Sequence, residues 1–485
     1  MGATDPSPAP RLPVGLKVSV DVRRDQQPHR DARIDAHVRV KAVGIGPSDE
    51  LPAVELAVVI ALDVAAGRRE AAAGALAAAL RALPDGLSFT VLGGADETGA
   101  LSGCYPLRGR WALAGRGEKR RAAFSAGRIL PAAGDRPPAG YQAWLAAARE
   151  LFARRPLPVR HLLLITDGSS HDGAAAPDLD EPGRDGGELN TELGRCAGWF
   201  TADVLALGGD WDPAPLLAVA ERLHGSPVDA PERFEPSVTE AVRRLRRVRS
   251  PELPVSVAVR PAVHGVTLTE TAPRRQALQA VHPAGDPRRF DFPTHQWEPG
   301  TRDYLLTLGV DASTDPLGVL LQLATVSVGD SIAPLLVRWL PPGDAVGVGA
   351  GGDGGSTLQT MDVATRMRAA LDRGFLALDP LSREEAGQQL GLAVRLANEI
   401  GASWVVARVR EVAEILDGSR GVVRIGPDVD LDSVRRGRLN IANGHLLDLP
   451  EQLAGKPVKC PVCDHPAGAH AQYCIACGRG LGCPG

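Results

Sequence analysis

The stretch that decides the fold of this chain is LAVVIALDVAAGRRE, from Leu56 to Glu70. Its first part is a continuous aliphatic run of strand length, which is typical of strands buried on both faces of a sheet. Asp63 ends the run, and an alanine-rich segment with high helix propensity follows. A strand that leads through a short loop into a helix is the unit from which parallel sheets are built.

Three further aliphatic runs follow, and helical patterns separate them. The runs are LSFTVLG (87–93), VRHLLLIT (159–166) and TADVLALG (201–208). The helical segments are REAAAGALAAALRAL (69–83), YQAWLAAARELFARR (141–155) and PAPLLAVAERLHG (213–225). Strands alternating with helices predict an α/β fold with a doubly wound, mostly parallel sheet. Ligand sites of such sheets lie beyond the carboxyl ends of the strands, where this chain has Asp63 and Asp167.

These motifs, in this order, resemble the von Willebrand factor A (vWA) domain, in the version found in actinobacterial vWA proteins. The resemblance covers residues 51–250. The family's metal-ion-dependent adhesion site (MIDAS) uses Asp-x-Ser-x-Ser, a threonine from a middle loop and a later aspartate. Asp63 and Asp167 match the aspartates, Ala65 and Gly67 replace the serines, and Tyr141 stands near the expected threonine. The resemblance therefore implies a vestigial, degenerate adhesion site.

The lost hydroxyl groups disfavour Mg²⁺ or Mn²⁺ at Asp63 and Asp167, because Mg²⁺ demands near-ideal octahedral oxygen coordination. One hypothesis is that Arg68 or Arg69 replaces the cation, since guanidinium groups pair well with carboxylates. A second is that later side chains supply substitute oxygens, namely Ser169, Ser170 and Asp172. A third is that both aspartates serve only the chemistry of turns at strand ends.

Segments on both sides of this domain alternate apolar and polar residues, as half-buried strands do. They lie at 16–50 and at 252–340, separated internally by Pro, Gly and Asp turns. Two N-terminal strands alone are marginally stable in water. We therefore expect one antiparallel β-sandwich from both segments, with the vWA domain (51–250) inserted and a disordered N-terminus at 1–15. Trp297 and Trp339 lie in or beside these strands, where packing is their expected role.

A glycine-rich stretch, PPGDAVGVGAGGDGGST (341–357), predicts a flexible linker. A small helical module is expected at 358–418, because three sets of apolar residues have helical spacing. The last of these sets is Val405, Val409, Val412 and Leu416. Residues 419–455 are interpreted as a connecting segment, partly extended.

The C-terminal segment, 456–485, contains the clearest chemical motif. Four cysteines form C-x₂-C-x₁₀-C-x₂-C: Cys460, Cys463, Cys474 and Cys477. Two such turns close a tetrahedral sulfur site, so the motif predicts a zinc ribbon with structural Zn²⁺. A site with four cysteines leaves no open position for catalysis. His465 and His470 are nearby alternative ligands, and a reducible disulfide pair is the competing interpretation.

Composition and charge restrict the function. Of 485 residues, 44% are hydrophobic and 23% charged, and the formal net charge is −4. That charge offers no general attraction to nucleic acid or anionic membrane. The sequence has no phosphate-binding loop and no assembled nucleophile and base, so we expect no enzyme activity. It begins without a secretory signal pattern, and C-x₂-C pairs fit a reducing compartment, so a cytoplasmic location is expected.

We predict a protein–protein interaction scaffold or adaptor, with protein partners and no membrane partner. Nucleic acid is disfavoured because the ribbon offers only a few basic and aromatic residues: Lys456, Lys459, Arg479 and Tyr473. One alternative is a metal-dependent ligand-binding protein that uses Asp63 and Asp167. Another is a nucleic-acid accessory factor that acts through the zinc ribbon.

Overall fold

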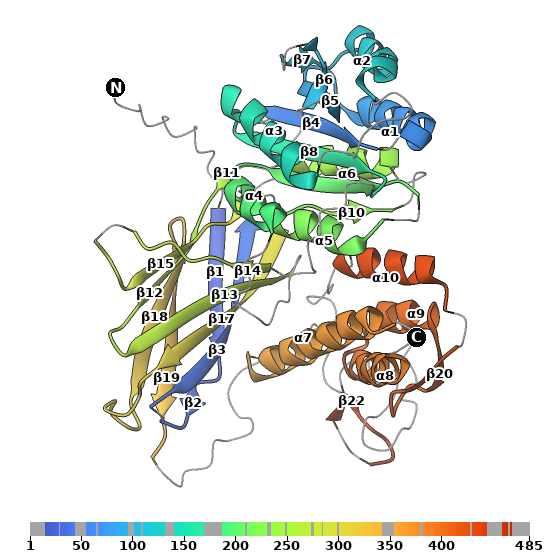
Figure 1. Cartoon of the computed structure of the whole chain (residues 1–485). Helices are drawn as coiled ribbons and strands as arrows, with labels where there is room; N and C mark the ends of the chain where they lie inside the picture. The colour runs from blue at the N-terminus through green and yellow to red at the C-terminus, as the bar shows by residue number, and fades with distance from the viewer. Residues whose placement is uncertain are drawn as a thin grey trace. The chain divides into compact units, whose positions relative to one another are not determined.

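A computed structural model gives the fold (Figure 1). Two compact units are present: one contains Gly44–Leu253 and His295–Pro299, and the other Gly15–Val43, Pro254–Thr294 and Gly300–Gly485. The predictions for residues 1–14 and for most of the linker, 342–353, fall outside the described residues. The described residues are 15–28, 30–43, 55–64, 66–95, 101–107, 110–130, 140–168, 187–208, 211–229, 234–247, 250–272, 276–283, 285–297, 300–341, 354–378, 382–426, 429–443, 458–463 and 466–467.

The first unit contains a seven-stranded sheet in the order β10-β9-β8-β4-β5-β6, with β7 also paired to β5. Neighbours from β10 to β5 run parallel, and β6 and β7 are antiparallel to β5. The predicted mostly parallel sheet is therefore confirmed. The strands are β4 (Leu56–Asp63), β5 (Ser88–Ala95), β6 (Leu101–Tyr105), β7 (Ala112–Leu113), β8 (Val159–Thr166), β9 (Thr201–Ala206) and β10 (Pro227–Val228).

Helices cover both faces of this sheet (Figure 1). One face packs against α1 (Arg69–Ala82), α2 (Arg116–Ile129) and α6 (Phe234–Arg247) in a shared apolar core. The other face carries α3 (Tyr141–Arg154), α4 (Glu188–Cys196) and α5 (Pro213–Arg222). A short 3-10 helix, η2 (Ala66–Arg68), follows β4 directly. Every residue of β4 is buried, which explains its continuous aliphatic sequence.

The second unit contains two five-stranded sheets. Strand β1 lies against β18 and β19 of the other sheet, and the amide of Val18 donates to Ser331 Oγ at 2.9 Å. One sheet is β1 (Gly15–Val22), β3 (Ala32–Val43), β17 (Gly300–Val310), β13 (Val263–Ala272) and β14 (Gln276–Leu278). The other is β15 (Arg289–Phe292), β12 (Val255–Val259), β18 (Leu320–Val328), β19 (Ser331–Trp339) and β2 (Asp25–Gln26).

The N-terminal strand β3 pairs with β17, a strand that comes after residues 51–250 in the sequence. β3 pairs antiparallel with β17 from Ala32↔Val310 to Ala42↔Gly300. Trp297 and Trp339 are 1% and 0% exposed, and both indole nitrogens donate hydrogen bonds. Trp297 lies in β16 (His295–Trp297), which pairs with β11 (Ser250–Glu252) in the first unit.

A helical region follows, built from α7 (Gly354–Leu376), α8 (Arg383–Ile400) and α9 (Ser403–Arg410). The helix α7 begins inside the segment expected to be linker. The third predicted helical face was wrong beyond Arg410, since Ala413–Asp417 forms β20 and pairs with β21 (Val422–Ile425). Leu416 is accordingly 52% exposed.

The segment interpreted as connecting contains a further helix, α10 (Leu431–Asn443), whose Val434 and Ile441 join the core of the helical region. Asp430 caps this helix by accepting from the amide and hydroxyl of Ser433 at 3.2 Å and 2.7 Å. The helical region therefore extends to residue 443 rather than 418.

The last described element is a hairpin of β22 (Val458–Lys459) and β23 (Pro466–Ala467). Among the described helices, none combines the length and apolar character needed to cross a bilayer.

Candidate functional site

The strand order locates the candidate site. From β4 the chain continues through β5 to β6 on one side, and from β8 through β9 to β10 on the other. Ligands of doubly wound sheets bind where the order reverses, at the carboxyl ends of the strands. Here that point lies between β4, which ends at Asp63, and β8, which is followed by Asp167. The amide of Asp167 donates to the Asp63 carbonyl at 3.1 Å, so the structure brings the two predicted aspartates together.

Asp63 is enclosed. Its side chain is 0% exposed, Oδ1 accepts from Trp144 Nε1 at 3.0 Å, and Oδ2 accepts from Thr166 Oγ1 at 2.7 Å. Hydrogen bonds to an ionised acceptor are stronger than those between neutral groups. Both carboxylate oxygens are thus engaged by neutral donors of the protein.

Thr166 connects Asp63 to a second aromatic side chain. Because its only hydroxyl proton goes to Asp63, the Tyr141 hydroxyl must donate to Thr166 Oγ1, at 3.2 Å. The amide of Gly168 donates to the same oxygen at 3.0 Å. Tyr141 and Trp144 lie one turn apart on α3 and are 1% and 2% exposed. Two aromatic residues of α3 therefore close over the end of β4.

Two glycines shape the loops around this network. Gly168, directly after Asp167, has φ +76°, and a side chain there would collide with Trp211. Gly208, after β9, has φ +79°, and a side chain there would collide with the guanidinium group of Arg68. Trp211 Nε1 donates to the Gly208 carbonyl at 2.8 Å. Only glycine fits such positions without strain.

The two arginines that could take the place of the metal cation lie in different surroundings. Arg69 Nη2 donates to the Gly127 carbonyl in α2, so this side chain is committed to that helix. Arg68 lies at the same edge of the sheet as Asp63, beside Gly208. The hypothesis of an arginine in place of the cation now depends on Arg68. Gly67, which replaces one of the family's serines, is exposed in η2. The position of the other serine and the side chains suggested as substitute ligands lie outside the described residues: Ala65, Ser169, Ser170 and Asp172.

Sequence reasoning missed Trp144 and Thr166. Both were present in quoted motifs, Trp144 three residues after Tyr141 and Thr166 directly before Asp167. The i, i+3 spacing places Tyr141 and Trp144 on one face of α3. That spacing was the available signal, but no local pattern indicates that the face meets Asp63.

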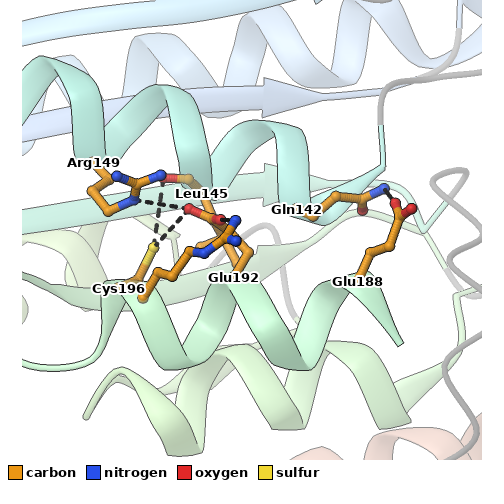
Figure 2. A network of polar contacts seen from close by, with 7 residues as sticks. Gln142, Leu145, Arg149, Glu188, Glu192 and Cys196 are labelled. Atoms are coloured by element: carbon orange, nitrogen blue, oxygen red, sulfur yellow. Dashed lines mark hydrogen bonds and ion pairs between the residues drawn. The ribbon is translucent and has the colours of Figure 1, made fainter. Parts of the chain in front are cut away.

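A polar network holds α3 in place against α4 (Figure 2). Glu192 accepts from Arg149 Nε at 2.9 Å and from Arg195 Nη1 at 3.1 Å, and it is only 5% exposed. Gln142 Nε2 donates to Glu188 at 3.3 Å. The hydrogen bond with Glu192 raises the pKa of Arg149, which keeps this arginine charged. The network fixes the helix that supplies both aromatic residues of the site.

Cys196 completes this network as an inert thiol. Its Sγ lies 3.7 Å from both the Leu145 carbonyl and Glu192 Oε1. Burial, together with the charge of Glu192, raises the pKa of Cys196 to about 12. Since the thiolate is the reactive form, this cysteine is a packing and hydrogen-bonding group at neutral pH.

The first C-x₂-C pair lies at the turn of the terminal hairpin. Cys460 is 1% exposed, and the amide of Val462 approaches its Sγ at 3.5 Å. Cys463 is exposed, and Cys474 and Cys477 lie outside the described residues, as do His465 and His470. Within the described ranges, no group of three or more His, Cys, Asp or Glu side chains could hold a metal ion. Half of the predicted zinc ligand set lies outside these ranges.

The strand order, with Asp63 and Asp167 side by side at the ends of β4 and β8, defines a doubly wound α/β domain with a candidate site at its switch point. Residues 56–228 match the family model described as von Willebrand factor type A domain. The chain thus carries a vWA domain, as the resemblance implied. The match covers the sheet from β4 to β10 and includes both aspartates.

One solved structure extends the similarity in fold to most of the chain. A von Willebrand factor type A protein from Catenulispora acidiphila is 20% identical and has a TM-score of 0.70, covering 89% of this chain and 97% of that one. The ArnB paralog VWA2 from Sulfolobus acidocaldarius is 10% identical with a TM-score of 0.48, covering 89% of this chain and 99% of that one. The comparison with curated proteins gives no match.

Proposed function

We propose that this protein is a cytoplasmic interaction scaffold whose vWA site has exchanged its divalent ion for a fixed hydrogen-bond network. The observation that carries the proposal is the enclosure of Asp63 by Trp144 and Thr166. A cation at Asp63 would have to displace these donors, and Mg²⁺ also requires several further oxygens. Ala65 and Gly67 offer no side-chain oxygen for that purpose. The domain then presents one constant surface instead of a metal-regulated one.

The arrangement of the chain supports an adaptor. Two compact units, the second of which ends in the cysteine segment, provide several surfaces on one polypeptide. A chain that binds two partners at once raises the effective concentration of each toward the other. Such a role requires no catalytic group, and the proposed function is non-enzymatic.

The test is a calorimetric titration of Mg²⁺ and Mn²⁺ into the full-length, zinc-loaded protein. We expect no saturable heat, because the carboxylate oxygens of Asp63 are already engaged. An Asp63→Ala variant serves as the matched control and should give the same trace. Saturable binding that disappears in Asp63→Ala would reject the proposal and favour the metal-dependent ligand-binding alternative.

We also propose that Cys460, Cys463, Cys474 and Cys477 hold a structural zinc ion. The amide of Val462 directed at Cys460 Sγ supports this, because tight turns with amides near thiolates stabilise the negative charge of a Zn–S₄ group. The strands β22 and β23 are two residues each, too short to form a core of their own, so metal binding would supply the folding free energy of this hairpin.

Elemental analysis tests the zinc assignment. Purified protein should contain about one zinc ion per chain, as four-cysteine sites do. Cys460→Ser and Cys474→Ser should each lose the ion, because a tetrahedral site with three sulfurs binds it far more weakly. Cys104→Ser, at a cysteine outside the motif, should retain it. A zinc content that is unchanged in both motif variants would contradict the assignment.

A further inference from the structure

The exposed face of α2 combines one aromatic side chain with arginines. Phe124 is 82% exposed, and Ala122, Ser125, Ala126 and Ile129 form the buried face of the helix. Arg120 lies four residues before Phe124 and Arg128 four residues after it, so all three share one side. Arg121, one turn before Phe124, is 72% exposed. We call Arg120, Arg121, Phe124 and Arg128 the α2 stripe.

Within the helix, only Arg121 of this stripe has its positive charge neutralised. The single acidic residue of α2, Glu118, accepts from Tyr105 at 2.5 Å and pairs with Arg121 at 2.7 Å. Lys119 pairs with Asp85 at 2.9 Å. Across the described part of the chain, neither Arg120 nor Arg128 has an ion pair. Two uncompensated guanidinium groups therefore flank the exposed ring.

A cation from outside the stripe lies at the carboxyl-terminal end of the helix. Arg69, from α1, donates to the Gly127 carbonyl beside Arg128. Its charge lies near the negative end of the helix dipole, which stabilises it there. The carbonyl contact fixes the guanidinium group next to the stripe, so less conformational entropy is lost when an anionic ligand binds.

We propose that the α2 stripe is a docking site for a short acidic segment of a partner protein, with carboxylates on both sides of an apolar residue. Arginine and aromatic residues are the groups most enriched where proteins bind each other. Guanidinium groups bind carboxylates through paired hydrogen bonds. The apolar residue of the partner packs on Phe124, and its carboxylates pair with Arg120 and Arg128.

Dimensions and charge favour an acidic peptide over a nucleic acid. Arg128 follows Arg120 by eight positions, which is about 12 Å along a helix and suits two turns of a partner helix. The protein as a whole carries a formal charge of −4, so a long polyanion is repelled beyond this helix. A short segment contacts the stripe alone. The inference does not depend on the ion content of the Asp63 site, because α2 packs on the other face of the sheet from α3.

Fluorescence anisotropy with a labelled synthetic peptide tests the proposal. The probe is an amphipathic peptide in which glutamates flank a leucine stripe, and the full-length protein is titrated into it. Combined Arg120→Glu and Arg128→Glu should weaken binding by at least about tenfold, which corresponds to about 1.4 kcal/mol. Phe124→Ala should weaken it by about tenfold, as truncation of an aromatic anchor does. A control peptide carries glutamine in place of each glutamate. It should bind the parent protein no more tightly than the original probe binds the Arg120→Glu, Arg128→Glu variant.

Controls separate docking from general effects. Arg222→Glu changes an exposed arginine of α5 on the other face of the sheet and should leave binding unchanged. The substitutions at Arg120, Phe124, Arg128 and Arg222 alter exposed side chains, so the circular dichroism melting curves of these variants should match the parent. Asp63→Ala should bind the peptide normally, which keeps this test independent of the proposed function.

Two results would overturn the inference. One is peptide binding that is equal in the parent and in the Arg120→Glu, Arg128→Glu variant. The other is binding of a mixed-sequence single-stranded oligonucleotide, or of phosphatidylserine vesicles, that exceeds peptide binding and is lost in the same variants.

Discussion

Replacement of Trp144 by alanine is expected to lower the free energy of unfolding of the first unit by about 3–5 kcal/mol, the usual cost of removing a buried tryptophan side chain. Trp144 is 2% exposed and donates to Asp63 Oδ1 at 3.0 Å. Its loss leaves a cavity and also removes a donor from a buried carboxylate. The predicted effect therefore combines a packing term and a hydrogen-bond term.

Trp144→Phe separates these two terms. A six-membered aromatic ring is kept while the N–H donor and the second ring of the indole are lost, so we expect a smaller cost of about 1–3 kcal/mol. Trp199→Ala is the matched control, because Trp199 is 43% exposed and its removal should cost much less. A full set of three variants then assigns the energy to the network around Asp63.

Hydrogen exchange measured on peptides from β4 and β8 is the appropriate readout. The chain has two compact units, so one global unfolding curve would mix their contributions. Hydrogen exchange in β4 and β8 should be fastest in Trp144→Ala, slower in Trp144→Phe and slowest in the parent. Parent-like exchange in Trp144→Ala would show that Asp63 is not held by this indole, and the support for a metal-independent site would be lost.

The vWA sheet could be predicted from the sequence because its signals are local. β4 and β8 are continuous aliphatic runs, and all eight residues of β4 are buried. The positions of Asp63 and Asp167 at one edge followed from a general rule for parallel sheets. The donors to Asp63 could not be found in this way. Trp144 lies 81 residues away in sequence, and only the packing of α3 on the sheet brings it to the carboxylate.

The error after α9 has a similar cause. Val405, Val409, Val412 and Leu416 fit helical spacing, yet β20 pairs with β21 from Ala413↔Ile425 onward. The local signal against a helix was the turn at Asp417, whose Oδ1 accepts from the amides of Ser419 and Arg420 at 2.9 Å and 3.1 Å. Aspartate before Gly-Ser favours such turns over helix interiors. Strand pairing is decided by partners that periodicity within one segment does not reveal.

Asp303→Asn is expected to destabilise the second unit by about 3 kcal/mol at neutral pH, the lower end for loss of one partner from a buried ion pair. Asp303 is 2% exposed, and its Oδ1 accepts from His37 Nε2 and Arg39 Nε, both at 2.7 Å. Because Arg39 is 34% exposed, water screens part of the attraction, and we take the lower end for this reason. These contacts join β3, which contains His37 and Arg39, to β17, which contains Asp303. Most of the first unit lies between these two strands in the sequence.

The effect should depend on pH in a defined direction. Burial by itself raises the pKa of Asp303, but hydrogen bonds from His37 and Arg39 outweigh it and hold the pKa below its usual value. A carboxyl group with a lowered folded-state pKa stabilises the fold above its unfolded pKa of about 3.9 and loses that contribution as pH falls through the folded value. The difference between parent and Asp303→Asn should therefore be full above about pH 5 and shrink on further acidification.

Urea unfolding followed by pulsed hydrogen exchange of β3 and β17 peptides, repeated across this pH range, measures the difference for the second unit alone. Asp330→Asn is the control, since Asp330 is exposed in the turn between β18 and β19 and should change stability little. A difference that grows as pH falls would contradict the lowered pKa of Asp303. An Asp303→Asn variant as stable as the parent at pH 7 would mean that apolar packing alone stabilises the pairing of β3 with β17. The buried His37–Asp303–Arg39 group would then fix the register of the two strands without adding to the free energy of unfolding.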